Sequence, residues 1–278
     1  MKTTDEKYGK ATLRIGQAKN GGWSGLVIIA GKQAGDIFHD DDRDRLRTRL
    51  MNHAGTVHPN YFGIDEAVTR FLRYMPGGFA GKRYTSHDSE RRYKVDAHRT
   101  LTNLLPLAAA ANATDEDGAR LAAAFKKDQL WTHMPSLQES TRLKEVLAKN
   151  GGAFLRAAAA FANEDFAEGI SGMHAALKAH GLLSWPIATY LPFLWNPARH
   201  MFLKPTVTRD FAERIGHQFA VEYDPEIRAD VYESLLDLVD HTATAIASLK
   251  PADRIDVQSF IWVVGEYREE DLPTPSAS

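Results

Sequence analysis

The amino-acid sequence predicts a predominantly α-helical protein of the α+β class, with a small β-hairpin or sheet at its N-terminus. Two observations predict the helices. Apolar residues recur at intervals of three and four along most of the chain, and capping residues and glycines bound these runs. A third observation predicts the strands, because two short runs of β-forming residues flank a glycine-rich turn near the start.

The predicted β element comes first along the chain. Residues 11–17 and 25–30 are rich in strand formers, and Asn20-Gly21-Gly22 lies between them. Glycine adopts the positive φ angle that a tight turn requires, at little steric cost. We therefore expect a hairpin or two neighbouring strands in this region.

Helices are expected through the rest of the first half. Apolar residues follow a helical period over residues 40–53, 64–74, 90–111 and 115–127. The second pattern stops at Pro76-Gly77-Gly78, which breaks a helix. A loop over residues 77–89 follows. Pro106 should bend the next helix, because proline has no backbone N–H to donate.

The second half is more clearly helical. Ser136 and Glu139 have the spacing of a capping box, and we expect the helix that they open to stop at Asn150-Gly151-Gly152. Further helices are expected over residues 153–162, over 165–180 and from Asp224-Pro225 to Leu249. Residues 255–267 form a run too short to distinguish a buried strand from a buried helix.

The best candidate for a domain boundary is a shift in composition near residues 113–117. It predicts an N-terminal domain over residues 1–112, with the β element and a basic loop rich in glycine and aromatic residues. A helical domain would then cover residues 113–270, although one compact domain also fits the sequence. Residues 271–278 are rich in proline and serine, and we expect a disordered tail.

The composition is that of a globular protein, with 44% hydrophobic and 25% charged residues. There is no cysteine, which excludes disulfides, thiolate nucleophiles and iron–sulfur clusters. The first ten residues are polar, and no apolar run approaches the ~20 residues that span a bilayer. We therefore expect a soluble cytoplasmic protein that does not enter a membrane.

Motifs for metals and nucleotides are missing from the sequence. The eleven histidines form neither His-x-x-x-His nor His-Glu-x-x-His, and the glycine-rich runs lack the Lys-Ser/Thr of a phosphate-binding loop. We therefore expect no metal and no cofactor. The net charge of -2 also argues against a protein that coats nucleic acid nonspecifically.

The first segment that could carry chemistry is basic. Residues 82–99, here called the basic segment, contain six Lys or Arg against three Asp or Glu. Arginine and lysine pair with phosphate oxygens, and aromatic rings stack on unpaired bases. The phosphate-binding candidates are Lys82, Arg83, Arg91, Arg92 and Lys94, and the stacking candidates are Phe79 and Tyr84. The alternative is an ordinary solvated loop and charged helix face.

A second segment, residues 195–205, is aromatic and carries two cations and a histidine. Trp195 could stack on a base and Lys204 could contact a phosphate. Because aromatic side chains bury large apolar areas, the alternative is that this segment belongs to the core.

Three carboxylates are candidates for acid–base chemistry. Asp65 and Glu66 open the helix that leads to the glycine loop, where they could equally complement the helix dipole. Asp256 could cap the start of a helix. In the functional interpretation, Asp256 or Gln258 is a polar contact inside a pocket.

Several of these blocks together resemble a poorly described prokaryotic module associated with restriction and anti-phage genes. The blocks are residues 186–194, 201–205 and 256–262, with a companion N-terminal half from Gly63 through Gly77-Gly78-Phe79 to Glu90-Arg91-Arg92-Tyr93-Lys94. The resemblance covers most of the chain and implies a role on DNA.

If the chain acts on DNA in that context, the lack of a nuclease metal motif, an ATPase loop and cysteine favours a metal-independent DNA glycosylase that removes a modified, hypermodified cytosine-type base from double-stranded phage DNA. Such an enzyme needs a base pocket, cations, stacking walls and one carboxylate. Asp65, Glu66 or Asp256 would supply the carboxylate. The alternatives are a noncatalytic reader of modified DNA, a helical protein-interaction module and a small-molecule enzyme.

Overall fold

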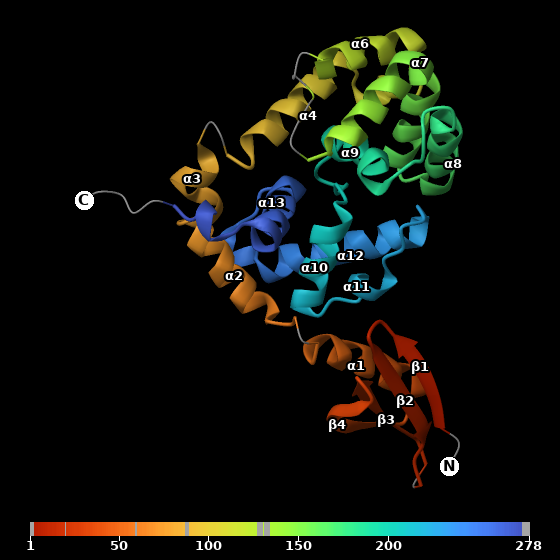
Figure 1. Cartoon of the computed structure of the whole chain (residues 1–278), viewed down its shortest axis with the longest axis vertical. Helices are drawn as coiled ribbons and strands as arrows, with labels where there is room; N and C mark the ends of the chain where they lie inside the picture. Colours follow the sequence, from red (N-terminus) through yellow and green to blue (C-terminus); the bar gives the residue numbers. More distant parts are fainter. Residues whose placement is uncertain are drawn as a thin grey trace, which may run out of the picture. The chain divides into compact units, whose positions relative to one another are not determined.

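The computed structural model of the chain describes residues 3–19, 21–58, 60–86, 89–126, 130 and 134–273. It confirms the predicted class: 62% of the chain is helical, and a small antiparallel sheet lies at the N-terminal end (Figure 1). The chain forms two compact units. Unit 1 comprises residues 1–69 and 209–223, and unit 2 comprises residues 70–208 and 224–278.

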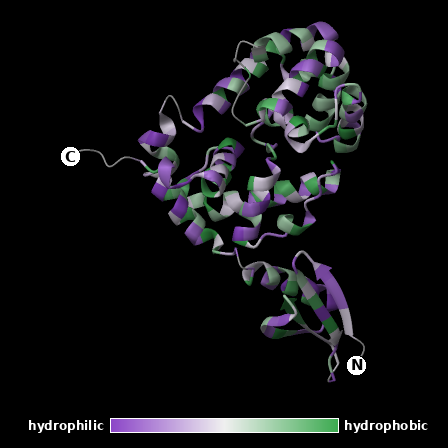
Figure 2. Cartoon of the chain, in the orientation of Figure 1, coloured by the Kyte–Doolittle hydropathy of each residue, from purple (hydrophilic) through white to green (hydrophobic). Residues whose placement is uncertain are grey.

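The sheet of unit 1 has four strands in sequence order, all antiparallel. They are β1 (Thr3–Tyr8), β2 (Ala11–Gln17), β3 (Trp23–Ile29) and β4 (Lys32–Asp40). The predicted hairpin is β2–β3, and Gly21 and Gly22 have the expected positive φ angles of 84° and 75°. The outer strands were not predicted, because both are mainly polar, as Figure 2 shows for β1.

Helix α1 (Arg43–Thr56) covers the sheet and completes the core of unit 1. Asp42 caps it by accepting a hydrogen bond from the Arg45 amide at 2.7 Å. Its inner face contributes Leu46 and Leu50, both fully buried. The C-terminal part of α10 (Pro205–Ile215) and α11 (Phe219–Glu222) also belong to this unit.

Unit 2 is built from helices (Figure 1). They are the C-terminal part of α2 (Gly63–Tyr74), η1 (Gly78–Ala80), α3 (Lys82–Thr85), α4 (Arg92–Leu104), α5 (Leu107–Ala110), α6 (Asp115–Lys126), α7 (Leu137–Ala162), α8 (Phe166–Leu177), α9 (Trp185–Trp195), α12 (Ala229–Ala245), η2 (Ala247–Leu249), α13 (Arg254–Glu266) and η3 (Glu269–Asp271). The boundary between the units falls inside α2 and inside α10.

The helix start at Ser136 is confirmed, and so is the interruption predicted at Asn150. Ser136 and Glu139 form the capping box, with bonds of 2.7 and 3.3 Å. At Asn150 the backbone leaves the helical region, with φ -148° and ψ 40°, so that α7 consists of two helical stretches joined at a kink, the second of which ends at Ala162. A Cβ atom on Gly151 would lie 2.5 Å from the Gly118 Cα atom, so this glycine permits close packing of α6 on α7.

Two other predictions change. Helix α12 begins at Ala229, five residues after Asp224, whose carboxylate instead accepts from the Glu226 amide at 2.8 Å.

The two units also divide the chain at places other than the predicted boundary at residues 112/113. Elements from both sides of that predicted boundary pack together within unit 2, such as α4 with α6 and α5 with α7. Of the predicted tail, residues 274–278 lie outside the described residues.

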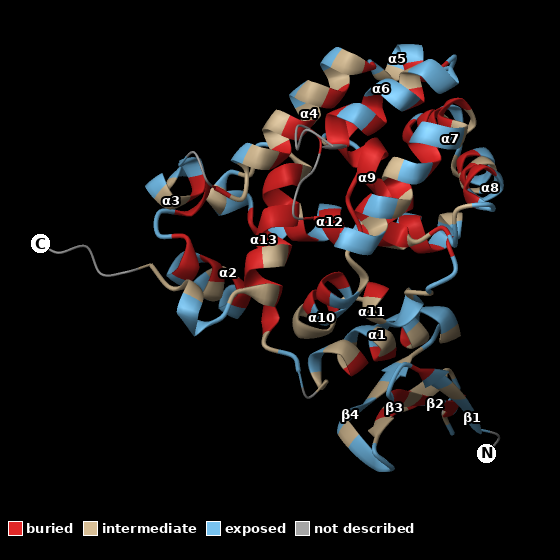
Figure 3. Cartoon of the chain, turned by 45° about the horizontal axis from the view of Figure 1, so that its top comes forward, coloured by how far each residue is buried: buried red, intermediate tan, exposed pale blue. Residues whose placement is uncertain are grey.

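Helices α9 and α13 form the centre of unit 2. Every residue of α9 is buried, and so are most residues of α13, as the red ribbons in Figure 3 show. Residues 255–266 of this run therefore belong to a buried helix, and Tyr267 follows it as the C-cap. Phe71 packs against Phe260 of this helix and against Phe79, with ring centroids 5.0 Å apart in each pair. Among the described residues, no helix combines the length and apolar character that crossing a membrane requires.

Candidate functional site

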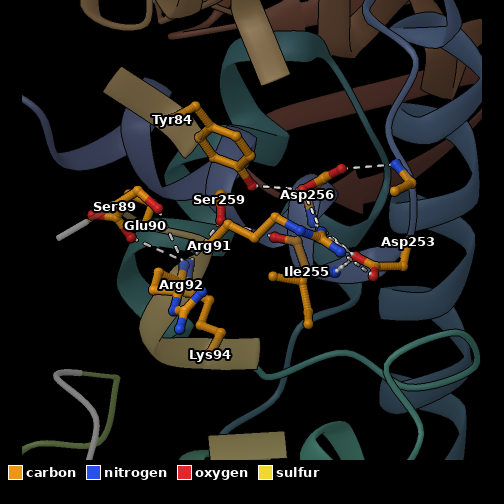
Figure 4. Close-up of polar contacts among 11 residues, drawn as sticks. Tyr84, Ser89, Glu90, Arg91, Arg92, Lys94, Asp253, Ile255, Asp256 and Ser259 are labelled. Carbon is orange, nitrogen blue, oxygen red and sulfur yellow. Dashed lines mark hydrogen bonds and ion pairs between the residues drawn. The ribbon is translucent and has the colours of Figure 1, made fainter. Parts of the chain in front are cut away.

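A buried polar network joins the start of α4 to the start of α13 (Figure 4). Arg91, which immediately precedes α4, donates two bonds of 2.8 Å to the Asp253 carboxylate and one of 2.6 Å to Asp256 Oδ1. Asp253 also caps α13 by accepting from the Ile255 amide at 2.9 Å. One guanidinium group therefore holds two carboxylates from a segment more than 160 residues away in sequence.

Asp256 is the most enclosed carboxylate of this network, with its side chain 3% exposed. Its Oδ1 atom also accepts from the Tyr84 hydroxyl at 2.7 Å, and Oδ2 accepts from the Ala252 amide at 2.7 Å. Burial, and then the charge of Asp256, raises the pKa of Tyr84, so the phenol remains a donor. These contacts make Asp256 a structural anchor of α13.

The network continues through Lys94 and Glu90. Lys94 is completely buried, and its Nζ atom donates to Ser259 Oγ at 2.8 Å and to Glu90 Oε2 at 3.2 Å. The hydroxyls of Tyr93 and Tyr267 donate to the same carboxylate at 2.8 and 2.9 Å. Glu90 and Lys94 are four residues apart, which lets their side chains meet along the helix face.

The charge state of this pair follows from opposing effects. Burial favours the neutral form of Glu90, but the Lys94 charge and the three donated hydrogen bonds outweigh it and lower the pKa of Glu90. Burial also lowers the pKa of Lys94, against the opposing attraction of Glu90. At neutral pH Glu90 is therefore a carboxylate with its charge compensated by donors.

Glu90 lies on the wall of a cavity of about 240 Å³ in unit 2. The cavity is lined by Glu90, Tyr93, Met134, Phe202, Gln258 and Trp262. Gln258 and Trp262 are one helical turn apart on α13, so both side chains reach the same face of that helix. The walls combine three aromatic rings with one carboxylate and one amide.

Gln258 is 4% exposed, and its Oε1 atom has no hydrogen-bond partner in the part of the chain that the structure describes. A buried acceptor without a partner costs about 1–3 kcal/mol. Because no described group fixes this oxygen, the amide can turn to pair with a molecule in the cavity. An amide offers one acceptor and two donors, which suits the edge of a heterocycle.

The structure separates the predicted phosphate-binding residues. Lys94 is fully buried, and the partly exposed Arg91 is paired with Asp253 and Asp256, so neither offers an unpaired charge to a phosphate. Arg92 is exposed and pairs with Asp96 at 2.9 Å. The other three predicted cations also have defined positions: Lys82 is exposed at the start of α3, Arg83 donates to the Asp271 carbonyl at 2.6 Å, and Lys204 donates to the Met134 carbonyl at 3.2 Å.

The predicted stacking residues and carboxylates lie elsewhere than the cavity. Phe79 and Tyr84 are core residues, and the Trp195 indole donates to the Leu105 carbonyl at 2.8 Å. Asp65 and Glu66 are exposed on the first turn of α2, in the residues of unit 1. The aromatic rings and the carboxylate that line the cavity are Tyr93, Phe202, Trp262 and Glu90. These residues belong to the sequence blocks that carry the resemblance, but they are not the residues predicted for the site.

From the sequence, Gln258 was a possible pocket contact and Phe202 belonged to an aromatic patch that could stack on a base, whereas Glu90, Tyr93 and Trp262 had no individual role. The i,i+4 spacing of Gln258 and Trp262 would have paired them, had residues 255–267 been assigned to a helix. Glu90, Tyr93 and Lys94 likewise have the i,i+3 and i,i+4 spacing of one helix face.

Comparison with protein-family models, with curated proteins and with solved structures finds no match to this chain. Within the described residues, no group of three or more His, Cys, Asp or Glu side chains could hold a metal ion. The cavity of unit 2 and its polar groups are the candidate functional site of the chain.

Proposed function

We propose that the cavity of unit 2 takes up a nucleobase extruded from double-stranded DNA, and that the chain is a DNA glycosylase acting on a modified, cytosine-type base of phage DNA. The observation that carries the proposal is the buried, unpartnered Gln258 oxygen beside the Glu90 carboxylate and three aromatic rings. Enzymes that act on a base must first remove it from the stacked duplex.

The chemistry of the walls favours a flat heterocycle with a donor on its edge. Tyr93, Phe202 and Trp262 offer stacking or edge contacts to a ring. A cytosine-type base has an exocyclic amine next to a ring acceptor at its edge, and the Gln258 amide can pair with both through its oxygen and its NH₂ group. The volume of about 240 Å³ lies below that of typical drug-sized pockets and suits one heterocycle.

Glu90 is the carboxylate that we assign to catalysis, in place of Asp65, Glu66 and Asp256. During hydrolysis the bond between C1′ of the sugar and the base nitrogen breaks, and water adds to C1′. One proton of that water leaves with the base. Positive charge builds on the sugar in the transition state, and an ionised carboxylate stabilises it. The donors around Glu90 keep it ionised for this purpose.

A noncatalytic reader of modified DNA is the second candidate, and one observation favours it. Glu90 accepts hydrogen bonds from Tyr93, Lys94 and Tyr267, and its pKa is lowered, which makes it a weak general base. The same contacts would serve a site that only binds the extruded base. Both candidates imply a cytoplasmic protein that meets phage DNA there.

One experiment tests both candidates. The purified chain is incubated with phage DNA rich in hypermodified cytosine and with unmodified DNA, and abasic sites are then cleaved with alkali. We expect strand breaks in the modified DNA only, and none with Glu90→Gln or Gln258→Leu. Retarded migration of modified DNA without breaks would support the reader. If the modified DNA shows no retardation and no breaks, the proposal of a DNA-directed function is overturned.

A further inference from the structure

We propose a second binding site, in unit 1, for a small organic carboxylate with an apolar body. A separate cavity of about 240 Å³ lies between one end of the sheet, the end of α1 and the α10–α11 segment. All of its lining residues belong to unit 1. The proposal is therefore independent of the DNA-directed function proposed for unit 2.

The first polar group of this cavity is the hydroxyl of Tyr8. The side chain is 9% exposed, and its hydroxyl has no hydrogen-bond partner among the residues that the structure describes. Burial, followed by the charge of Glu222, raises the pKa of Tyr8 to about 12. The phenol is therefore a protonated donor at neutral pH, lining the cavity with its bonding capacity unused.

Two cations line the same cavity. Lys10 and Arg209 are exposed, and neither has a carboxylate partner within the described ranges. The guanidinium of Arg209 instead lies over the Tyr223 ring, 5.3 Å from its centroid. The carboxylate in the wall, Glu213, already accepts from Asn60 Nδ2 at 3.1 Å. The lining thus offers two uncompensated positive charges to an anion.

Two histidines, His58 and His217, also line the cavity, and the remainder of the lining is apolar and built mainly from small residues. Ala11, Ile29, Ala54, Ala212 and Ala220 contribute to it. At the end of α1, a Cβ atom on Gly55 would lie 2.4 Å from the Gly216 carbonyl oxygen, so the two backbones meet directly without side chains between them. Small residues leave the hollow open, and its apolar walls favour a hydrocarbon or aromatic body over a hydrated ion.

These features together select the ligand. An inorganic anion would leave the apolar walls exposed to water, and a neutral hydrocarbon would leave Lys10, Arg209 and the Tyr8 hydroxyl unused. A carboxylate on a short alkyl chain satisfies both sets of groups. The expected orientation places the carboxylate at the two cations and the chain along the alanine-lined walls.

Calorimetric titration of the full chain with octanoate, and with octanol as the neutral analogue of the same length, tests this site. We expect octanoate to bind at least tenfold more tightly than octanol. The double variant Lys10→Met/Arg209→Met should lose that preference, because both charges are replaced while the bulk of each side chain is roughly kept. Equal binding of the two probes to the wild type, or no binding of octanoate, would overturn the proposal.

A second pair of variants locates the site. Ala220→Leu should fill the cavity and abolish octanoate binding, whereas Ala175→Leu places the same added volume on the surface of α8 in unit 2 and should not affect it. Circular dichroism verifies that both variants keep their helical content. Unchanged octanoate binding by a folded Ala220→Leu variant would overturn the assignment to this cavity. The Ala220→Leu and Ala175→Leu variants should release bases from phage DNA at the same rate.

Discussion

The charged residues of the two units are used in different ways. In unit 1, Arg14 pairs with Asp5 and Arg45 with Asp40, over sequence separations of nine and five residues, and both arginines stay exposed. In unit 2, Arg91 and Lys94 bond to partners 165 residues away and are half-buried and fully buried. Arginine and lysine thus form local ion pairs with exposed side chains at these positions of unit 1, and long-range contacts inside the polar network of unit 2.

This difference shows why a count of charges along the sequence misjudges the surface. The basic segment has a local excess of three positive charges, but the structure directs Arg91 and Lys94 inward. Their carboxylate partners come partly from α13, which a local count does not include. Buried ion pairs are costly to break, whereas exposed pairs contribute little, so substitutions should separate the two kinds clearly.

The largest effect is expected for Asp256→Ala. It leaves the Arg91 guanidinium and the Tyr84 hydroxyl without this acceptor inside unit 2, which should lower the free energy of unfolding by about 3–5 kcal/mol. Denaturant titration measures the loss. Asp5→Ala, in an exposed pair, is the matched control. If Asp256→Ala and Asp5→Ala lower the free energy of unfolding by a similar small amount, the inferred contrast between the two units is wrong.

The next effect depends on pH. The folded state lowers the pKa of Glu90, so this carboxylate contributes stability above its unfolded pKa of about 4.5 and loses that contribution as pH falls through its folded pKa. Glu90→Gln should cost about 1–3 kcal/mol at pH 7. Thermal unfolding should show the gap to wild type closing at pH values below 4.5. A gap that stays constant with pH would show that Glu90 does not titrate as inferred.

Gln258→Leu should separate stability from function. Removing a buried amide with an unpartnered oxygen should leave the free energy of unfolding within about 1 kcal/mol of wild type or raise it. Base release or DNA retardation should fall at least tenfold, because the polar contact to the base is lost. Ser184→Ala removes another buried side-chain oxygen that has no hydrogen-bond partner among the described residues, and it should leave activity unchanged. Equal activity in both variants would remove Gln258 from the site.

The smallest effect is expected for Arg92→Ala. Its pair with Asp96 is exposed and spans one helical turn, so stability should change by about 0.3–0.5 kcal/mol. If Arg92 contacts a DNA phosphate, the slope of log binding constant against log salt should decrease by about one unit. Gel retardation at several salt concentrations gives this slope. An unchanged slope would exclude Arg92 from the DNA contact.

Much of the fold could be predicted from local patterns. The capping box at Ser136 and the turn at Gly21-Gly22 depend on residues that are neighbours in sequence, and both predictions are confirmed. The site could be predicted only in part. Gln258 was proposed as a pocket residue, but Phe202 and Glu90 reach the same cavity from distant segments, and no local pattern encodes that meeting.

The contact between Gly118 and Gly151 has a consequence for handling the protein. Because α6 and α7 touch through bare backbone, a single added methyl group at either position would force the two helices apart. Neither glycine lines the cavity of unit 2. Gly118→Ala would thus loosen the contact between two helices that do not line the cavity, and would show whether the proposed base pocket tolerates a packing change elsewhere in unit 2.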